Sequence, residues 1–262
     1  MVSTQKGIPL VVVGAAGRMG RAVIEAASAR PGFALRALVD VAANLRGTDG
    51  VWTSRLDSAI RPGMVVIEFS SPAGCRAAAR LSAMRGAALV SGTTGLSEVG
   101  EAEVRRAGRR IPIVRASNFS LGIAALRRLL NEALQVLPGW DLEIVERHHG
   151  AKVDSPSGTA MTLAADAVKA RGLSSGALRF GRKGPMGPRS RGEIGVHAVR
   201  GGTWIGDHTA LLAGPGEWLE LRHVAQDRLA FAQGALAAAQ FLARGPRPGI
   251  YTIQDVLVAR ST

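Results

Sequence analysis

The stretch LVVVGAAGRMG, Leu10 to Gly20, joins a continuous apolar run to three evenly spaced glycines. An apolar run that stops at a glycine is typical of a buried strand, and the pattern from Arg18 to about Arg30 predicts a helix after it. Gly14, Gly17 and Gly20 would let the backbone turn tightly and approach a pyrophosphate, whose charge the N-terminus of the helix would receive. The stretch therefore predicts the strand-turn-helix unit that binds a dinucleotide.

Further apolar runs separated by helical patterns continue this arrangement. Such alternation indicates crossover units, and hence a parallel sheet with helices on both faces. We therefore expect an α/β fold of the Rossmann type, with a doubly wound parallel sheet. The expected strands are Ala34 to Val39, Met64 to Phe69, Ala87 to Val90 and Ile111 to Val114, and the helices between the last three are Gly74 to Arg85 and Glu98 to Arg110.

The choice of cofactor depends on Asp40, at the end of the second expected strand. In a chain with 33 glycines, the glycine pattern alone could be only a tight turn. The strand before it, the helix after it and an acid placed to bind the adenosine ribose favour a dinucleotide site. Asp40 favours NADH because it would repel a 2′-phosphate, but Arg18 or Arg46 could offset that repulsion. NADH, NADPH or both remain open.

Three polar turns follow successive strands, where ligands of such folds bind. They are FSSP (69–72), GTTG (92–95) and SNFSLG (117–122). Each alone is ordinary turn chemistry, but together they indicate a floor for the nicotinamide end of the cofactor. The candidate cofactor-binding residues are Gly14, Ala15, Gly17, Arg18, Met19, Gly20, Asp40, Phe69, Gly92, Thr93, Thr94, Ser117, Asn118 and Phe119.

The second half begins with an apolar-periodic helix, Asn118 to about Leu137, and a strand, Asp141 to Val145. The motif ERHHGAKVDSPSGTA, Glu146 to Ala160, comes next. In it, Ser155-Pro156 reads as a helix N-cap followed by proline at the first helical position, with the helix running to about Arg171. Ser157, Gly158 and Thr159 would then lie in the first turn, where unpaired amides and the helix dipole form a carboxylate or phosphate site.

Two adjacent histidines precede Lys152 by three and four positions. One alternative is that the two histidines have no catalytic role and are a surface pair or a structural pair. A zinc site is the other rival, but we find no third ligand at suitable spacing, so we expect no metal. Adjacent side chains of an extended segment point in opposite directions, so His148 and His149 should differ in role. One could donate a proton near neutral pH while the other and Lys152 hold an anionic substrate.

The rest of the chain has a different layout. Residues 179–192, RFGRKGPMGPRSRG, form either a mobile flap or a plain inter-strand loop. Strand-like stretches near 194–199, 203–212 and 218–224 indicate a mostly antiparallel sheet whose open face a subunit partner would cover. A helix at about 227–242 and a strand near 252–258 close the chain. We expect a dinucleotide-binding domain of residues 1–118 and 230–262, and a substrate-binding, oligomer-forming domain of residues 119–229.

Composition limits the possible partners. The net charge is +13 and the isoelectric point about 11.4, which would suit nucleic acid. The basic residues are dispersed, with local clusters such as 105–110, and no stacking platform or helix-turn-helix pattern accompanies them, so we expect no nucleic acid partner. A single cysteine, Cys75, indicates a reducing cytoplasm. We also expect no signal peptide, membrane helix or membrane partner, because no apolar run is long enough.

The motifs GAAGRMG, GTTG, SNFSLG and above all ERHHGAKVDSPSGTA resemble those of the 4-hydroxy-tetrahydrodipicolinate reductase family, also called dihydrodipicolinate reductases. The similarity runs nearly end to end and includes EIGVHAVRGG, IGDHTALL and DRLAFAQGA. It implies a cytoplasmic two-domain homotetramer that uses NADH or NADPH to reduce a cyclic dicarboxylate on the diaminopimelate route to lysine. It also implies that His148 is the general acid, that Lys152 supports proton transfer and binds substrate, and that the substrate contacts are His149, Ser157, Gly158 and Thr159.

Two positions depart from the family pattern. Glu68 stands where the family commonly has an aspartate, and no basic residue directly follows Asp40, which weakens the case for NADPH. The enzymatic rival is a reductase of the same fold acting on another cyclic imine or imino acid. A non-enzymatic rival is a regulator that senses NAD(P)H and binds DNA through its basic surface. An intact His148 and Lys152 argue against both.

Overall fold

The computed structural model describes residues 7–44 and 51–260, so Arg46 lies outside the described residues. The chain splits into two compact units. Unit 1 is Met1–Leu121 with Arg228–Thr262, and unit 2 is Gly122–Asp227. Each unit has its own sheet and its own hydrophobic core. The assignment of one unit to cofactor and the other to substrate stays a prediction at this point.

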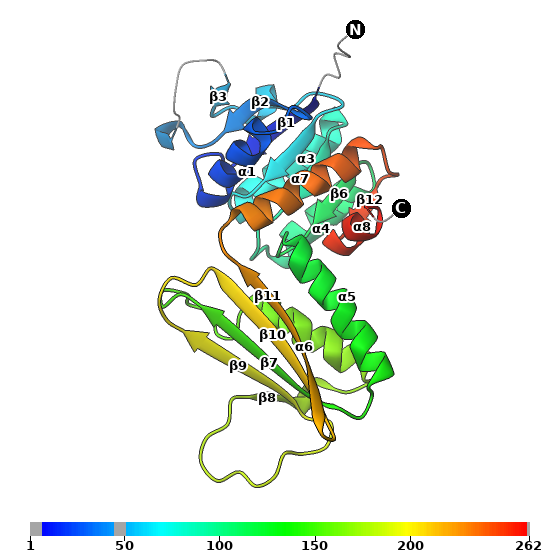
Figure 1. The fold of residues 1–262 in the computed structure, drawn as a ribbon. Coiled ribbons are helices and arrows are strands. Elements are labelled where there is room, and N and C mark those ends of the chain that lie inside the picture. The colour runs from blue at the N-terminus through cyan, green and yellow to red at the C-terminus, as the bar shows by residue number, and fades with distance from the viewer. Residues whose placement is uncertain (1–6, 45–50, 261–262) are drawn as a thin grey trace. The chain divides into compact units, whose positions relative to one another are not determined.

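Unit 1 contains a seven-stranded sheet in the order β12-β6-β5-β4-β1-β2-β3 (Figure 1). Every pairing in it is parallel. The order reverses at β1, as in a doubly wound fold, which confirms the predicted class. The strands are β1 (Ile8–Val13), β2 (Phe33–Val39), β3 (Trp52–Thr53), β4 (Val65–Glu68), β5 (Ala88–Ser91), β6 (Pro112–Arg115) and β12 (Gly249–Tyr251).

Helices cover this sheet in two pairs, with α1 beside α7 and α3 beside α4 (Figure 1). Alternate residues of the central strands, such as Val11, Val66 and Leu89, are fully buried in one cluster with Ala78 of α3 and Val104 of α4. This two-sided burial explains why the strands read as continuous apolar runs. The helices are α1 (Arg18–Ser28), α2 (Leu56–Ala59), α3 (Pro72–Arg85), α4 (Glu98–Gly108), α7 (Leu229–Ala243) and α8 (Ile253–Val258), with a 3₁₀ turn at Ala42–Asn44.

The end of the chain corrects one prediction. Residues 252–258, expected as a strand, form helix α8, and the strand lies just before them as β12. Thr252 begins the helix with a capping box: its hydroxyl accepts from the Asp255 amide, and the Asp255 carboxylate accepts from the Thr252 amide. These reciprocal bonds satisfy backbone donors that an apolar pattern does not reveal.

Unit 2 contains a five-stranded sheet in the order β11-β10-β7-β9-β8. The pairs β10–β11 and β10–β7 are antiparallel, whereas β7–β9 and β8–β9 are parallel. The sheet is therefore mixed rather than mostly antiparallel, because β9 returns through α6 and runs beside β7 in the same direction. The strands are β7 (Asp141–His148), β8 (Leu178–Phe180), β9 (Ile194–Arg200), β10 (Gly206–Gly214) and β11 (Glu217–Ala225).

Helices α5 (Leu121–Val136) and α6 (Gly158–Ala170) bury their apolar sides against this sheet, and a 3₁₀ turn follows at Ser175–Ala177. Both helices start later than expected. Asn118 accepts a hydrogen bond from the Ser120 amide through its side chain and so precedes α5. Ser157, not Ser155, caps α6, since its hydroxyl accepts from the Ala160 amide, and the Ser155-Pro156 bond is cis.

Two arginines of the basic segment 179–192 bind strand β7. Arg182 contacts both Glu143 oxygens, at 3.1 and 2.8 Å, and Arg189 contacts Glu143 at 3.0 Å and Asp141 at 2.7 Å. Part of the segment is strand β8, which the sequence pattern did not reveal. These contacts favour a fixed inter-strand connection over a free flap.

Candidate active site

The glycine turn after β1 is as tight as its spacing predicts. Gly14 has φ of +79°, and a Cβ there would lie 2.2 Å from the Phe69 carbonyl oxygen. A Cβ on Gly20 would lie 2.1 Å from the Gly14 carbonyl oxygen. Gly17 is the N-cap of α1 and uses no side chain to cap it. Only glycine fits at positions 14 and 20, and the first amides of α1 are left to bind an anion.

Asp40 faces the same turn. Its carboxylate accepts hydrogen bonds from the amides of Ala16 and Val41, both at 2.8 Å, and from Asn44 Nδ2 at 2.9 Å. Burial would raise the pKa of Asp40, but these bonds outweigh it and hold the pKa below its ordinary value. A cavity of about 380 Å³ adjoins Asp40. Its lining includes Gly14, Gly17, Arg21, Asn44, Phe69 and Ser70.

Arg21, rather than Arg18, lines this cavity, and its Nε donates to the Ala16 carbonyl at 2.8 Å. Arg21 was not among the predicted residues; it directly follows the glycine motif and lies one helical turn after Gly17. Helical spacing places residues three and four apart on one face, and that is the signal that could have found it.

The polar turns after β4 and β5 meet at Glu68, the last residue of β4. Its fully buried carboxylate accepts from the Ser70 amide at 2.7 Å, the Ser70 hydroxyl at 2.6 Å, the Thr93 hydroxyl at 2.6 Å and the Ser91 hydroxyl at 3.1 Å. Phe69 packs edge-on against Phe119, with ring centroids 5.5 Å apart. A Cβ on Gly92 would lie 2.0 Å from the Phe69 ring.

The turns predicted as a floor for the nicotinamide are thus brought together by side chains of their own residues. The structure places Phe69, Gly92, Thr93 and Phe119 in this one group. Glu68, noted in the sequence only as a departure from the family pattern, joins the turns after β4 and β5, and Phe69 connects them to Phe119.

In unit 2, strand β7 carries the histidine motif at its end. Leu142, Ile144, Glu146 and His148 alternate along β7 and are all buried. A strand directs every second side chain to the same face, so Glu146 and His148 continue the apolar face that packs against α5 and α6. His149 follows on the other side, and its amide donates to the Trp204 carbonyl at 2.9 Å. The two histidines therefore differ in environment, and a difference in their roles stays a prediction.

Glu146 accepts hydrogen bonds from several surrounding side chains and from one backbone amide. His148 Nδ1 lies 2.6 Å from Glu146 Oε2, Arg200 of β9 forms bonds of 2.8 and 2.7 Å to both carboxylate oxygens, and the Ser157 amide donates to Oε1 at 2.9 Å. His208 of β10 lies opposite Glu146 in the antiparallel register, and its Nε2 is 3.1 Å from the Ser157 hydroxyl. Burial lowers the pKa of His208 to about 4, so it is neutral at neutral pH.

Lys152 lies in the loop between β7 and α6. Its Nζ is 2.6 Å from the Asp154 carboxylate. The hydrogen bond from Lys152 is the main reason that the pKa of Asp154 is below its ordinary value, and the amide of Gly158 adds to the lowering. A carboxylate of the chain itself thus lies against Lys152 and the start of α6, which shows that these donors suit a carboxylate.

Arg200 and His208 were not predicted as site residues, and no role was predicted for Glu146. A signal was present, because Glu146 interrupts the apolar face Leu142-Ile144 two positions before His148. Arg200 lies on the same side of β9 as Ile194 and Val196, which are buried, and Ala198, which is exposed. A charged residue on a buried face has to be paired, so such interruptions mark a polar site.

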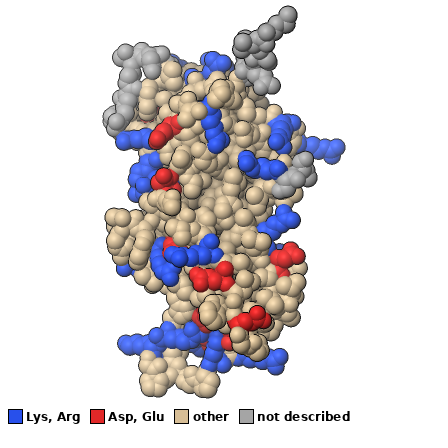
Figure 2. Space-filling model, viewed as in Figure 1, with Lys and Arg blue, Asp and Glu red and all other residues tan. Residues whose placement is uncertain are grey.

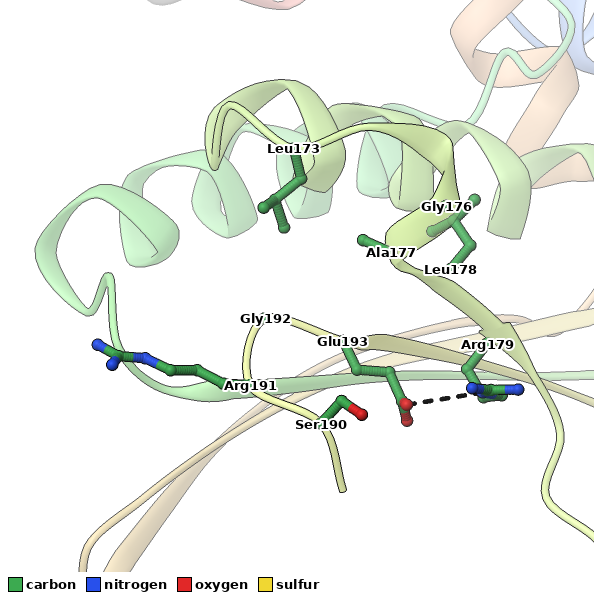
Figure 3. A pocket seen from close by; sticks show the side chains of 9 residues that line it. All are labelled: Leu173, Gly176, Ala177, Leu178, Arg179, Ser190, Arg191, Gly192 and Glu193. Atoms are coloured by element: carbon green, nitrogen blue, oxygen red, sulfur yellow. Dashed lines mark ion pairs between the residues drawn. The ribbon is translucent and has the colours of Figure 1, made fainter. Parts of the chain in front are cut away.

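A cavity in unit 2 lies away from this motif. Its volume is about 330 Å³, and none of the predicted site residues lines it. Figure 3 shows Leu173 facing Arg179 and Glu193, whose ion pair spans 3.6 Å. Among the described residues, no group of three or more histidine, cysteine, aspartate or glutamate side chains could hold a metal ion.

Charge and hydropathy add two observations. On the face that Figure 2 shows, lysine and arginine side chains form separate groups divided by uncharged surface, and acidic side chains lie among them in places. In residues 7–44 and 51–260, no helix has the length and apolar character that crossing a bilayer requires.

Known proteins resemble the chain along nearly its whole length. The family described as "Dihydrodipicolinate reductase, N-terminus" matches residues 8–119, and "Dihydrodipicolinate reductase, C-terminus" matches residues 122–257. The chain belongs to the dihydrodipicolinate reductase family. It is therefore a reductase, and the resemblance on the motifs is confirmed.

Two relatives agree with this membership. A 4-hydroxy-tetrahydrodipicolinate reductase from Thermomicrobium roseum is 46% identical over 256 residues, which cover 95% of this chain and 98% of that one. One from Thiobacillus denitrificans is 40% identical over 263 residues, with 95% and 98% covered.

Solved structures share the fold at lower sequence identity. The dipicolinate-bound dihydrodipicolinate reductase from Paenisporosarcina sp. TG-14 matches with a TM-score of 0.78 at 22% identity, over 94% of this chain and 97% of that one. A probable dehydrogenase from Thermotoga maritima matches with a TM-score of 0.60 at 12% identity, over 96% and 93%. At these identities the likeness shows the architecture alone.

Proposed function

We propose that this dihydrodipicolinate reductase reduces 4-hydroxy-tetrahydrodipicolinate to tetrahydrodipicolinate in the diaminopimelate route to lysine, with NADH or NADPH as the reductant. The observation that carries the proposal is the convergence of a buried histidine, a lysine and a helix N-terminus on one short loop of unit 2. This set suits a dicarboxylate substrate whose ring receives a proton while its carboxylates are bound.

His148 is the general acid in this proposal. When bound, the reduced nicotinamide supplies a hydride to an electron-poor ring carbon of the substrate. The 4-hydroxyl group of the substrate leaves as water. His148, in its imidazolium form, donates a proton to the ring atom next to the carbon that receives the hydride, where the negative charge develops, and so stabilises the transition state. Lys152 supports that transfer and offsets part of the charge of the dianion.

The substrate carboxylates are held by Lys152, His149 and the start of α6. The contact between Lys152 and Asp154 at 2.6 Å supports this assignment, since a carboxylate already fits that donor. A substrate carboxylate would replace Asp154 there. Ser157, Gly158 and Thr159 form the cap and first turn of α6, whose dipole favours an anion.

Residues of unit 1 would hold the dinucleotide. The close approach of Gly14 and Gly20 to the backbone and the cavity beside Asp40 fit a pyrophosphate and a ribose. Asp40 supports NADH, while Arg21 on the cavity wall could bind a 2′-phosphate, so use of both remains part of the proposal. The residues we assign to the cofactor are Gly14, Ala15, Gly17, Arg18, Met19, Gly20, Asp40, Phe69, Gly92, Thr93, Thr94, Ser117, Asn118 and Phe119.

We further propose a cytoplasmic homotetramer assembled through the sheet of unit 2. Strand β11 exposes Trp218, Leu219 and Val224, at 73%, 36% and 50% of their surface. Exposed apolar residues grouped on one strand favour burial against another subunit. The single cysteine, Cys75, is buried and free, which agrees with a reducing compartment.

The test is the loss of nicotinamide absorbance with purified protein, with 4-hydroxy-tetrahydrodipicolinate generated in the cuvette by the preceding synthase. We expect oxidation of NADH or NADPH that requires the synthase product, and the ratio of the two rates gives the preference. Binding of cofactor without oxidation would contradict the substrate assignment and favour another cyclic imine, for which a panel of such compounds would then be assayed.

A further inference from the structure

Glu146 is fully buried in unit 2, and the mechanism above gives it no part in the proton transfer. Its Oε2 accepts from His148 Nδ1 at 2.6 Å and from Arg200 at 2.8 Å. Its Oε1 accepts from Arg200 at 2.7 Å and from the Ser157 amide at 2.9 Å. A carboxylate has about four acceptor positions, so these donors saturate it and fix its orientation.

The contact with Glu146 determines which nitrogen of His148 can react. An ionised carboxylate only accepts hydrogen bonds, so His148 carries a proton on Nδ1. Nε2 is then the ring atom left to carry the transferred proton. A Cβ on Gly206 would lie 3.2 Å from that atom, so the absence of a side chain at this position leaves room beside it.

Four charged or titratable groups face His148 from different elements: Glu146 on its own strand, Lys152 in the following loop, Arg200 on β9 and His208 on β10, whose ring centroid is 5.1 Å away. Burial lowers the pKa of His148 below its ordinary value. The hydrogen bond and charge of Glu146 oppose that lowering, whereas Lys152 and Arg200 add to it.

The ionisation of Glu146 is itself maintained by its partners. Burial would raise the pKa of Glu146, but hydrogen bonds from Arg200, His148 and the Ser157 amide outweigh burial and hold it below the ordinary value. Glu146 is therefore a stable negative charge next to an imidazole whose positive form burial disfavours.

We propose that Glu146 is a positioning residue of the reaction, holding the His148 ring by Nδ1 so that Nε2 presents the proton, and fixing Ser157 at the start of α6 in register with it. The Glu146 carboxylate thereby fixes both the orientation of the His148 ring and the position of Ser157, where the site for the substrate carboxylate begins. This inference rests on the proposed function, since it assumes that His148 is the acid of that reaction.

The experiment is the pH dependence of kcat for Glu146→Gln, which keeps the shape and removes the charge. Because His148 acts in its protonated form, kcat falls as pH rises through its pKa. We expect this descending limb to move about one pH unit lower, kcat to fall about 10- to 100-fold, and KM to change far less.

Glu143→Gln is the matched control. Glu143 lies on the same strand, but on the other face, and binds His197 at 2.7 Å and two arginines. Its replacement should leave kcat and the limb unchanged. If Glu146→Gln also left the limb in place, Glu146 would be only structural and the inference would be wrong.

Arg200→Gln supplies a second variant of opposite sign. Removing this positive charge should move the limb to higher pH, because Arg200 lowers the pKa of His148. General damage to the fold would not move the limb in opposite directions for the two variants. Limbs that moved in the same direction in the two variants would overturn the inference. If Glu146→Gln did not fold, a limb that moved to lower pH in Arg200→Gln would overturn it.

A readout without turnover separates this inference from the proposed function. Nitrogen NMR of the imidazole rings, assigned by comparison with His148→Gln, should show His148 protonated on Nδ1 in the parent and a rise of the Nε2-protonated form in Glu146→Gln. This shift would support the positioning role even if the substrate assay failed. An unchanged tautomer would contradict it even if the assay succeeded.

Discussion

Glu68 of unit 1 and Glu146 of unit 2 are both fully buried near the carboxyl end of a strand, but their partners differ. Glu68 accepts hydrogen bonds from hydroxyl groups and an amide: those of Ser70, Ser91 and Thr93. Glu146 accepts from a guanidinium, an imidazole and an amide. The first set contains no group that titrates near neutral pH, and the second contains His148.

The difference shows two uses of a buried carboxylate. Glu68 connects the turns after β4 and β5, so it can position a cofactor site without taking part in proton chemistry. Glu146 places a fixed negative charge against His148, the proposed acid, so its effect should appear in the pH dependence of the rate. Four substitutions can test this contrast, in order of expected effect.

The largest effect should come from removing the titratable partner of Glu146. In His148→Gln we expect kcat to fall about 10²- to 10⁴-fold, the usual contribution of a general acid. Binding of dipicolinate, measured by calorimetry, should change little because the proton is needed mainly in the transition state. His149→Gln is the control, and it should raise KM more than it lowers kcat. Near-normal turnover in His148→Gln would mean that another group is the acid.

Glu68→Gln should act on stability and cofactor binding instead. The amide nitrogen of glutamine cannot accept, so hydroxyl donors that faced the carboxylate lose partners, at a cost of about 1–3 kcal/mol in the free energy of unfolding. KM for the cofactor should rise, and the descending limb of kcat against pH should stay in place. A limb that moved as in Glu146→Gln would erase the contrast between the two carboxylates. Urea unfolding and steady-state kinetics measure both effects.

The fold of unit 1 was largely predictable because its longer elements have a local signal. Buried parallel strands are continuous apolar runs, and the glycine turn at Gly14 has a steric cause that the spacing reveals. The short elements β3 and α2 were missed because two to four residues carry too little pattern. At residues 252–258, the apolar pattern predicted a strand while the Thr252–Asp255 capping box determines a helix.

The candidate site was predictable only in part. His148 and Lys152 lie in one motif, four positions apart, so the sequence alone shows that they are neighbours. Arg200 and His208 lie 54 and 62 residues beyond Glu146 in the chain, and only the register of β9 and β10 with β7 brings them beside it. Strand pairing between distant segments is not encoded locally, so the sequence could mark Arg200 as unusual without naming its partner.

A third carboxylate, Glu143, sharpens the comparison from the other face of β7. Burial would raise its pKa, but hydrogen bonds from Arg182, His197 and Arg189 outweigh this and lower it to about 2. Since the folded pKa lies below the unfolded one, its stabilisation is complete above the unfolded value and is lost as pH falls toward 2.

We therefore expect Glu143→Gln to lower the free energy of unfolding by about 1–2 kcal/mol at about pH 7, after allowance for solvent screening, and by clearly less at about pH 3. Urea unfolding at the two pH values, followed by far-ultraviolet circular dichroism, measures the difference. Unlike Glu146→Gln, this variant should keep the parent kcat. A stability loss equal at both pH values would show that the cluster around Glu143 does not depend on its charge.

Asp40 gives the smallest expected effect and completes the series. Like those of Glu68, its donors among the described residues are uncharged, but it borders a cavity and can still reach a ligand. Asp40→Asn removes the charge that would repel a 2′-phosphate, so the ratio of kcat/KM for NADPH to that for NADH should rise, by up to about tenfold, or 1.4 kcal/mol. Glu103→Gln, on the exposed surface of α4, is the control and should leave the ratio unchanged. An unchanged ratio in Asp40→Asn would place the ribose elsewhere. The cavity beside Arg21 would then have to be assigned to a different part of the cofactor.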